Sequence, residues 1–72
     1  MADLLPSFSD DQLRQLQAEV DRLPALERRA FLLASRDRLT SHQIAERLDV
    51  SPRRARRLIA RALARLDARL SP

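Results

Sequence analysis

The stretch V-S-P-R-R-A-R-R, residues 50–57, determines how the rest of the chain is interpreted. Ser51 followed by Pro52 predicts a helix start, because serine accepts a hydrogen bond from a free amide at the N-cap and proline fits the first helical position. The first turns then carry arginines, although the partial positive charge of a helix N-terminus favours Asp or Glu there. An anion held by the helix end and the arginines together makes this arrangement favourable. We therefore predict that this stretch binds nucleic-acid phosphate.

Positive charge is concentrated in the last part of the chain. The 72 residues carry a net charge of +4. Residues 1–22 contain five acids and two arginines, which gives −3, whereas residues 51–72 contain seven arginines and one acid, Asp67, which gives +6. This asymmetry indicates a polyanionic partner for one face. All fourteen basic residues are arginine, which suits forked contacts with phosphate and guanine, although GC-rich coding explains the choice of Arg over Lys equally well.

The composition argues against an enzyme. The chain contains no Cys and no Gly, so it has neither a thiolate metal site nor a Gly-rich phosphate loop. Its one histidine, His42, falls in the first turn of a predicted helix and is expected to be an exposed capping neighbour or phosphate contact rather than a general base. We expect no catalytic residue, metal or cofactor. The acidic N-terminus and the lack of a long apolar run predict a cytoplasmic protein without a membrane partner.

The first half of the chain is predicted to form two helices after a loose lead-in over residues 1–8. The capping-box spacing of Ser9 and Gln12 predicts a helix from residue 10 to about residue 22, at the start of a single domain over residues 9–72. Phe8, which has staple spacing with the first leucine of this helix, is expected in the core rather than stacked on bases. The apolar positions predict one buried stripe of Leu13, Leu16, Val20 and Leu23.

The second predicted helix begins at Pro24 and runs to about residue 35. Its A-F-L-L-A run, residues 30–34, is apolar on most sides, so we expect it to be the most enclosed element. Phe31, like Phe8, is expected in the core.

The last two predicted helices form a helix-turn-helix. Thr40 and Gln43 repeat the capping-box spacing and predict a short helix over residues 41–48. The turn L-D-V-S then leads into a long helix from Pro52 to about Leu70. The inward residues of the short helix are predicted to be Ile44, Ala45 and Leu48. The long helix is predicted to bury Ala55, Ile59, Ala62 and Leu66, with Leu58, Leu63 and Leu70 on the flanks.

The arginines of the long helix are predicted to face away from this core. At 100 degrees per residue, Arg53, Arg57 and Arg61 lie opposite the apolar positions, with Arg54 to one side and Arg56 to the other. Simple solvation of an exposed face does not explain why this helix has a single acid among seven bases. A membrane-surface helix would normally present bulky apolar residues where this one has alanine. Nucleic-acid binding is therefore favoured.

Three segments resemble region 4 of bacterial sigma factors: L-P-A-L-E-R-R-A-F-L-L (23–33), I-A-E-R-L-D-V-S (44–51) and I-A-R-A-L (59–63). The likeness is closest to the extracytoplasmic-function class, and the third segment is similar to its iron-siderophore-responsive subgroup. The resemblance implies an all-α, four-helix domain without a wing. Its C-terminal helix-turn-helix would bind double-stranded promoter DNA at the −35 element, and RNA polymerase core would hold the domain through its beta-flap. We expect a monomer in isolation.

The resemblance also implies roles for individual residues. The implied DNA-binding residues are Ser41, His42, Ser51, Arg53, Arg54, Arg56, Arg57 and Arg61. Arg53, Arg54 and Arg57 would face the major groove, and Arg56 and Arg61 would lie near phosphates. The two residues at the start of the short helix would approach the DNA backbone. Arg28 matches a family arginine, for which a phosphate contact and an internal salt bridge are both open.

The chain departs from the family pattern at several positions. Asp49 and Arg38 stand where glycine is common, and we predict a positive φ at Asp49. Leu58 replaces a polar residue that is common in the recognition helix. Region 2, which would melt and read the −10 element, is missing, so we expect either a fragment or a stand-alone relative.

Two other functions share part of the pattern. The effector domain of a LuxR-type response regulator has a similar I-A-x-x-L and S-x-x-x layout, but the L-P start and the missing lysine-leucine ending argue against it. Alternatively, the basic helix would be covered by an acidic anti-sigma protein. That partner is compatible with DNA binding, because such inhibitors compete with DNA for the same face.

Overall fold

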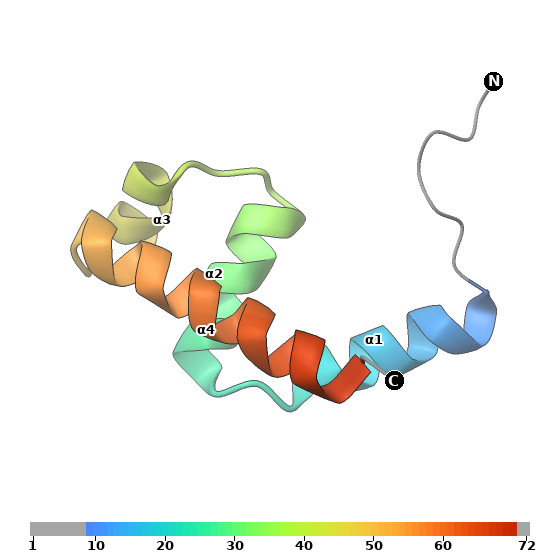
Figure 1. The fold of residues 1–72 in the computed structure, drawn as a ribbon. Coiled ribbons are helices and arrows are strands. Elements are labelled where there is room, and N and C mark those ends of the chain that lie inside the picture. The colour runs from blue at the N-terminus through green and yellow to red at the C-terminus, as the bar shows by residue number, and fades with distance from the viewer. Residues whose placement is uncertain (1–8, 71–72) are drawn as a thin grey trace, which may run out of the picture.

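The computed structural model describes residues 9–70, which form four helices and no strand. They are α1 (Asp10–Asp21), α2 (Ala25–Ser35), α3 (Ser41–Leu48) and α4 (Pro52–Leu70). Figure 1 shows the long helix α4 crossing the domain, with α3 beside its beginning and α1 near its end. The predicted all-α fold and its helix-turn-helix are confirmed. The predicted lead-in over residues 1–8, including Phe8, lies outside the described residues.

Three of the four helices begin at the side-chain caps that the sequence predicts. At α1, the Ser9 hydroxyl accepts from the Gln12 amide at 3.2 Å, and the Gln12 side chain accepts from the Ser9 amide at 2.8 Å. Thr40 and Gln43 make the same two bonds at α3, also at 3.2 and 2.8 Å. At α4, the Ser51 hydroxyl accepts a hydrogen bond from a backbone amide of the first turn. These local bonds set the helix starts without help from tertiary contacts.

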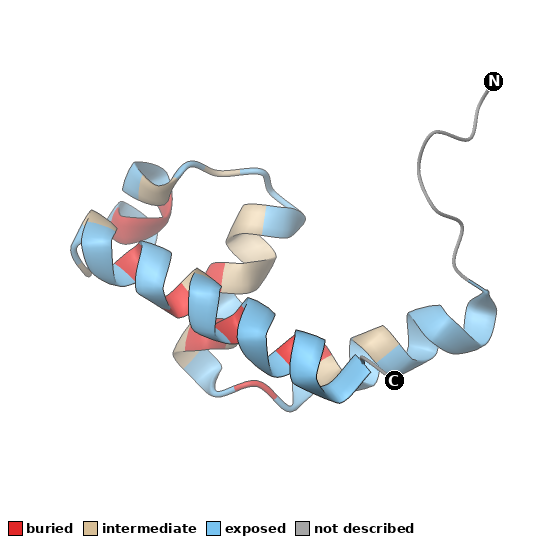
Figure 2. Ribbon diagram, in the orientation of Figure 1, coloured by how far each residue is buried: buried red, intermediate tan, exposed pale blue. Residues whose placement is uncertain are grey.

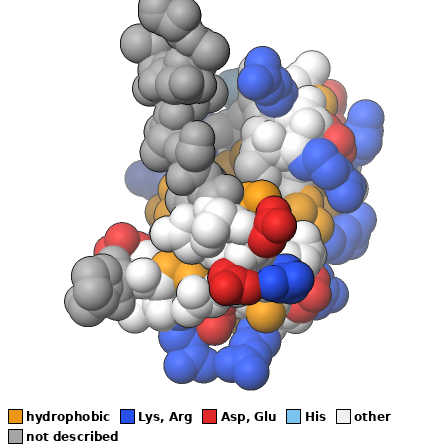
Figure 3. Space-filling model, turned by 90° about the vertical axis from the view of Figure 1, so that its right-hand side faces the viewer, with side chains coloured by type: hydrophobic (Ala, Val, Ile, Leu, Met, Phe, Trp, Pro, Cys, Tyr) orange, Lys and Arg blue, Asp and Glu red, His pale blue; other side chains and the backbone are white. Residues whose placement is uncertain are grey.

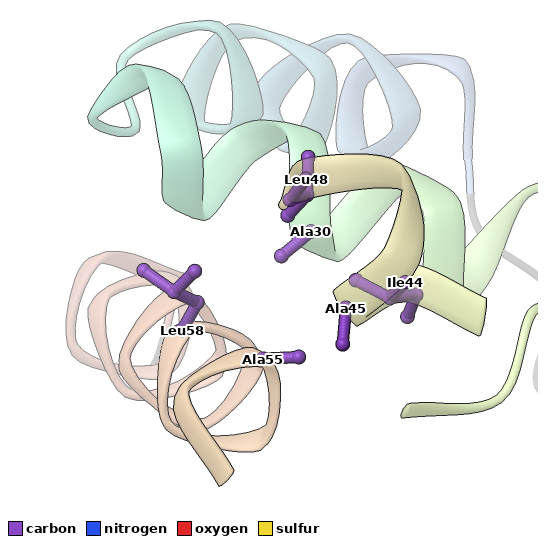
Figure 4. Close-up of a cluster of buried hydrophobic side chains, with 6 residues drawn as sticks. All are labelled: Ala30, Ile44, Ala45, Leu48, Ala55 and Leu58. Atoms are coloured by element: carbon purple, nitrogen blue, oxygen red, sulfur yellow. The ribbon is translucent and has the colours of Figure 1, made fainter. Parts of the chain in front are cut away.

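The core consists of two clusters placed one after the other along α4. The first lies where α2, α3 and the beginning of α4 meet, as Figure 4 shows, and contains Ala30, Ile44, Ala45, Leu48, Ala55 and Leu58. The second joins the end of α1 to the later part of α4 and contains Val20, Leu23, Ala62 and Leu66. Because α4 contributes to both, it connects the helix-turn-helix to the N-terminal half of the domain.

The buried face of α4 differs from the predicted one at two neighbouring positions. Leu58, predicted on the flank, is only 6% exposed, whereas Ile59, predicted at the centre of the core, is half-buried. Leu63 and Leu70 are exposed. The partners of α4 change from α3 to α1 along its length, so a single projection of the whole helix misplaces the face at its beginning.

One burial prediction for the first half of the chain is wrong, and another is supported. Leu13 is 49% exposed, because the N-terminal half of α1 reaches beyond the end of α4, as Figures 1 and 2 show. The run over residues 31–34 in α2 is half-buried, and only three of the 11 residues of α2 are exposed, the smallest share among the four helices, which agrees with the prediction that α2 is the most enclosed element. In α2, the only buried residues are Glu27 and Ala30.

Candidate nucleic-acid interface

The turn between α3 and α4 contains a residue in the left-handed backbone conformation. Asp49 has φ 58° and ψ 48°, which confirms the predicted positive φ. The amides of Asp49 and Val50 both donate to the Ala45 carbonyl, the second at 3.0 Å. This reversal ends α3 and lets Ser51 cap α4 two residues later.

A second left-handed residue, Arg38, precedes α3 with φ 56°. The next residue, Leu39, donates its amide to the Leu33 carbonyl at 3.0 Å. Both positions at which the chain carries Asp or Arg in place of glycine therefore keep the backbone conformation that glycine adopts freely. A non-glycine side chain makes this conformation less favourable, and arginine is less suited to it than aspartate.

The beginning of α4 presents a surface of arginines, which we call the basic face: Arg53, Arg54, Arg56, Arg57 and Arg61. All five are exposed, and no ion pair within residues 9–70 involves any of them. Because the helix buries Ala55, Leu58 and Ala62, the side chains at 53 and 57 lie on its opposite side. Within the described residues, these cations have no intramolecular counter-charge.

The local electrostatics of this helix start favour an anion. The first turn of α4 contains no acidic residue. The Ser51 hydroxyl accepts from the Arg54 amide at 3.1 Å, but Arg54 cannot return the bond as Gln12 and Gln43 do. The helix dipole adds partial positive charge to the arginines. Free amides, a dipole and guanidinium groups are the elements of a phosphate site at a helix N-terminus.

The remaining predicted site residues lie at the same end of the molecule. Ser41, half-buried, and His42, exposed, occupy the first turn of α3. Figure 1 shows α3 and the first turns of α4 side by side at this end. Ser51 is exposed, but its hydroxyl oxygen already serves as the N-cap of α4. The structure thus gathers the predicted residues from two helices on one end of the domain.

The last two arginines of α4 are held by carboxylates. The Arg65 Nε donates to Glu27 Oε1 at 2.7 Å, although the two residues are 38 positions apart in the chain. The Arg69 Nε lies 3.5 Å from Glu19 Oε1. Arg22 Nη1 approaches the other oxygen of Glu19 at 3.9 Å. Figure 3, which looks onto this end of the molecule, shows acidic and basic side chains next to each other.

The sequence analysis missed these ion pairs. Glu19 lies outside the buried stripe predicted for α1, but its side chain is only 15% exposed. The helical projection gives one indication of these ion pairs, because positions 65 and 69 fall near the edge of the buried face of α4, away from positions 53 and 57. That signal does not identify the partners, which come from other helices.

Arg28, for which two roles were open, makes an internal contact of another kind. Its Nη1 donates to the backbone carbonyl of Asp21 at 3.1 Å. Asp21 is the last residue of α1. The guanidinium therefore caps the carbonyl end of α1, where a cation is favoured.

Residues 9–70 hold no group of three or more His, Asp or Glu side chains placed to bind a metal ion. Over the same residues, none of the helices combines the length and the hydropathy of a membrane-spanning segment.

Comparison with known families gives one match. A family model described as "Sigma-70, region 4" matches residues 13–66, which takes in most of α1, all of α2 and α3, and α4 as far as Leu66. Searches of curated proteins and of solved structures gave no match.

Proposed function

The chain belongs to the sigma-70 region 4 family, the domain with which a sigma factor binds the promoter −35 element in transcription initiation, and from this premise we propose how its residues contact DNA. α4 lies in the major groove, with Arg53, Arg54 and Arg57 at base edges. Arg56 and Arg61 contact the phosphates that flank the groove. The observation that carries the proposal is the basic face itself, whose five exposed cations have no ion pair within residues 9–70.

The chemistry of arginine fits both roles. The major groove admits an α-helix, and a guanidinium donates two hydrogen bonds to O6 and N7 of guanine. Arginines at the sides of the helix reach the backbone oxygens, where they release counterions and fix the register of the helix on the duplex. The rotation of α4 supports the base contacts of Arg53 and Arg57, whose side chains lie opposite the buried face, whereas the roles of Arg54, Arg56 and Arg61 rest on the family resemblance.

The helix before the turn supplies further backbone contacts in the proposed complex. In a helix-turn-helix, the first helix crosses the DNA backbone while the second enters the groove. Ser41 and His42 occupy the first turn of α3, where free amides favour a phosphate. Ser51 acts through its cap, which holds the first turn of α4 in place.

RNA polymerase and promoter DNA are the partners that the family implies. We assign the beta-flap as the polymerase contact and residues 9–72 as the binding unit, which acts as a monomer. The segment I-A-R-A-L (59–63) supports placement in the extracytoplasmic-function class, siderophore-responsive type. The match to a sigma family supports this function over a LuxR-type effector domain. An acidic anti-sigma protein would compete with DNA for the basic face.

The proposal is tested by DNA selection followed by fluorescence anisotropy. The unchanged protein first selects a duplex from a random pool, and its affinity is compared with that for a scrambled duplex. Arg53→Ala combined with Arg57→Ala is expected to abolish this discrimination. Arg14→Ala, an exposed arginine of α1 paired with Asp11, is the matched control and is expected to leave it unchanged. Equal effects of the two variants would contradict the proposal.

A further inference from the structure

Among residues 9–70, the shortest side-chain hydrogen bond between two helices joins α2 to the later part of α4. Glu27 is 6% exposed and is the one buried charged residue among residues 9–70. Its carboxylate accepts a hydrogen bond from the Arg65 Nε at 2.7 Å. A buried carboxylate is unfavourable unless it is paired, so this contact ties the position of the Arg65 side chain to α2.

The pair supplies a directional constraint in addition to the packing of the surrounding core. Ala30 of α2 and Ala55 and Ala62 of α4 are fully buried, and methyl groups let the two helices approach closely. Such small side chains resist rotation of α4 about its axis less than the buried Leu58 and Leu66 of the same helix do. A charge-assisted hydrogen bond requires one orientation of donor and acceptor, and therefore one rotation of the helix that carries the donor.

The rotation of α4 decides what its first turns present to DNA. Arg57 precedes Arg65 by eight residues of the same helix, about 12 Å along its axis. Any turn of the helix about its axis at Arg65 is therefore transmitted to Arg57. A small rotation of α4 would therefore move the Arg57 guanidinium from the base edges toward the phosphates.

We propose that Glu27 is a positioning residue for DNA recognition, which acts through Arg65 to fix the rotation of α4 so that Arg53 and Arg57 face the groove. This inference rests on the proposed function of the basic face. It also assigns Arg65 to an internal role, in contrast to the arginines at the beginning of the helix. The pair of Arg69 with Glu19 is longer, at 3.5 Å, and constrains the helix less.

The test removes the pair without changing the net charge. Glu27→Met with Arg65→Met deletes one negative and one positive charge, and such apolar replacements of a buried ion pair often keep or raise stability. We expect this double variant to fold and to bind scrambled DNA as the unchanged protein does. Its preference for the selected duplex over the scrambled one is expected to fall about tenfold, a usual size for coupling between contacting residues.

A matched control uses the exposed pair of α1. Asp11→Asn with Arg14→Gln also removes one charge of each sign, but within a single helix. It is expected to leave both affinities unchanged. If the Met variant does not fold, Arg65→Lys replaces it, because lysine keeps the charge but cannot reproduce the Nε–H bond.

The outcomes separate this inference from the proposed function. A variant that discriminates as well as the unchanged protein overturns the positioning role and leaves the proposed function intact. Equal loss on both duplexes also overturns it, because it makes Arg65 a phosphate contact. If the unchanged protein does not discriminate at all, the proposed function fails. In that case, residual dipolar couplings of the α4 amides, measured without DNA, compare the rotation of α4 in the double variant and in the unchanged protein. Different couplings support the constraint, and unchanged couplings overturn it.

Discussion

The two halves of α4 use the same residue type in opposite ways. In residues 52–61, exposed arginines have no ion pair within the described part of the chain. In residues 62–70, Arg65 and Arg69 bind Glu27 and Glu19. One half is therefore prepared for an external anion, and the other is already neutralised by the domain itself. The comparison teaches that a basic helix does not act as one uniform surface, because each arginine takes its role from its neighbours.

The largest expected effect is on stability, and it comes from removing an ion pair in residues 62–70 of α4. Arg65→Ala leaves the buried Glu27 carboxylate without its partner, so we expect unfolding free energy to fall by roughly 2 to 4 kcal/mol, less than for a fully buried pair because Arg65 is half-exposed. Urea denaturation followed by circular dichroism measures the change. Arg61→Ala is the control, with an expected change within about 0.5 kcal/mol. Equal stability losses in the two variants would remove the distinction between the halves.

The next largest effect is on DNA affinity, and it comes from losing a base contact in residues 52–61 of α4. Arg57→Ala is expected to weaken binding to the selected duplex by roughly 1 to 3 kcal/mol and to relax sequence preference, because a guanidinium-to-guanine contact is lost. Anisotropy titrations with selected and scrambled duplexes measure it. The same loss on both duplexes would refute the base contact.

A smaller effect on DNA affinity separates the proposed phosphate contacts of the basic face from its proposed base contacts. Arg61→Ala is expected to weaken binding to all duplexes about equally and to reduce the slope of log affinity against log salt by about 1. Titrations at several salt concentrations provide the slope. A loss confined to the selected duplex would make Arg61 a base contact and contradict its assignment to phosphate.

The smallest expected effect is a change in stability caused by a substitution in the turn between α3 and α4. Asp49 has a positive φ, so Asp49→Gly is expected to be neutral or to stabilise the domain by up to about 1 kcal/mol. The free energy of unfolding measures this change, and DNA affinity serves as the control. Destabilisation with unchanged DNA affinity would mean that the aspartate side chain contributes more than its backbone strain costs.

Sequence reasoning succeeded where the determinants are local. Ser9, Thr40 and Ser51 cap helices through bonds to residues three positions away, so their spacing in the chain is sufficient evidence. The left-handed Asp49 followed from its place in the turn. The basic face was predicted because its arginines gather within about two and a half turns of one helix.

Sequence reasoning failed where distant segments decide the outcome. Leu58 is more buried and Ile59 less buried than predicted, because the partners of α4 change from α3 to α1 along its length. Leu13 is exposed because α1 reaches past the end of α4, a matter of helix arrangement rather than periodicity. The bond from Arg65 to Glu27 spans 38 residues, and no local pattern marks the two as partners. Such contacts depend on tertiary packing, which periodicity does not specify.

The most direct test of the contrast within α4 follows the arginine side chains of the unchanged protein. Nuclear magnetic resonance detects each Nε–H group separately while the selected duplex is added. The account predicts that the Nε–H signals of the basic face shift together and saturate with one affinity, whereas those of Arg65 and Arg69 stay in place. Equal shifts throughout α4, or larger shifts at Arg65 and Arg69, would contradict it.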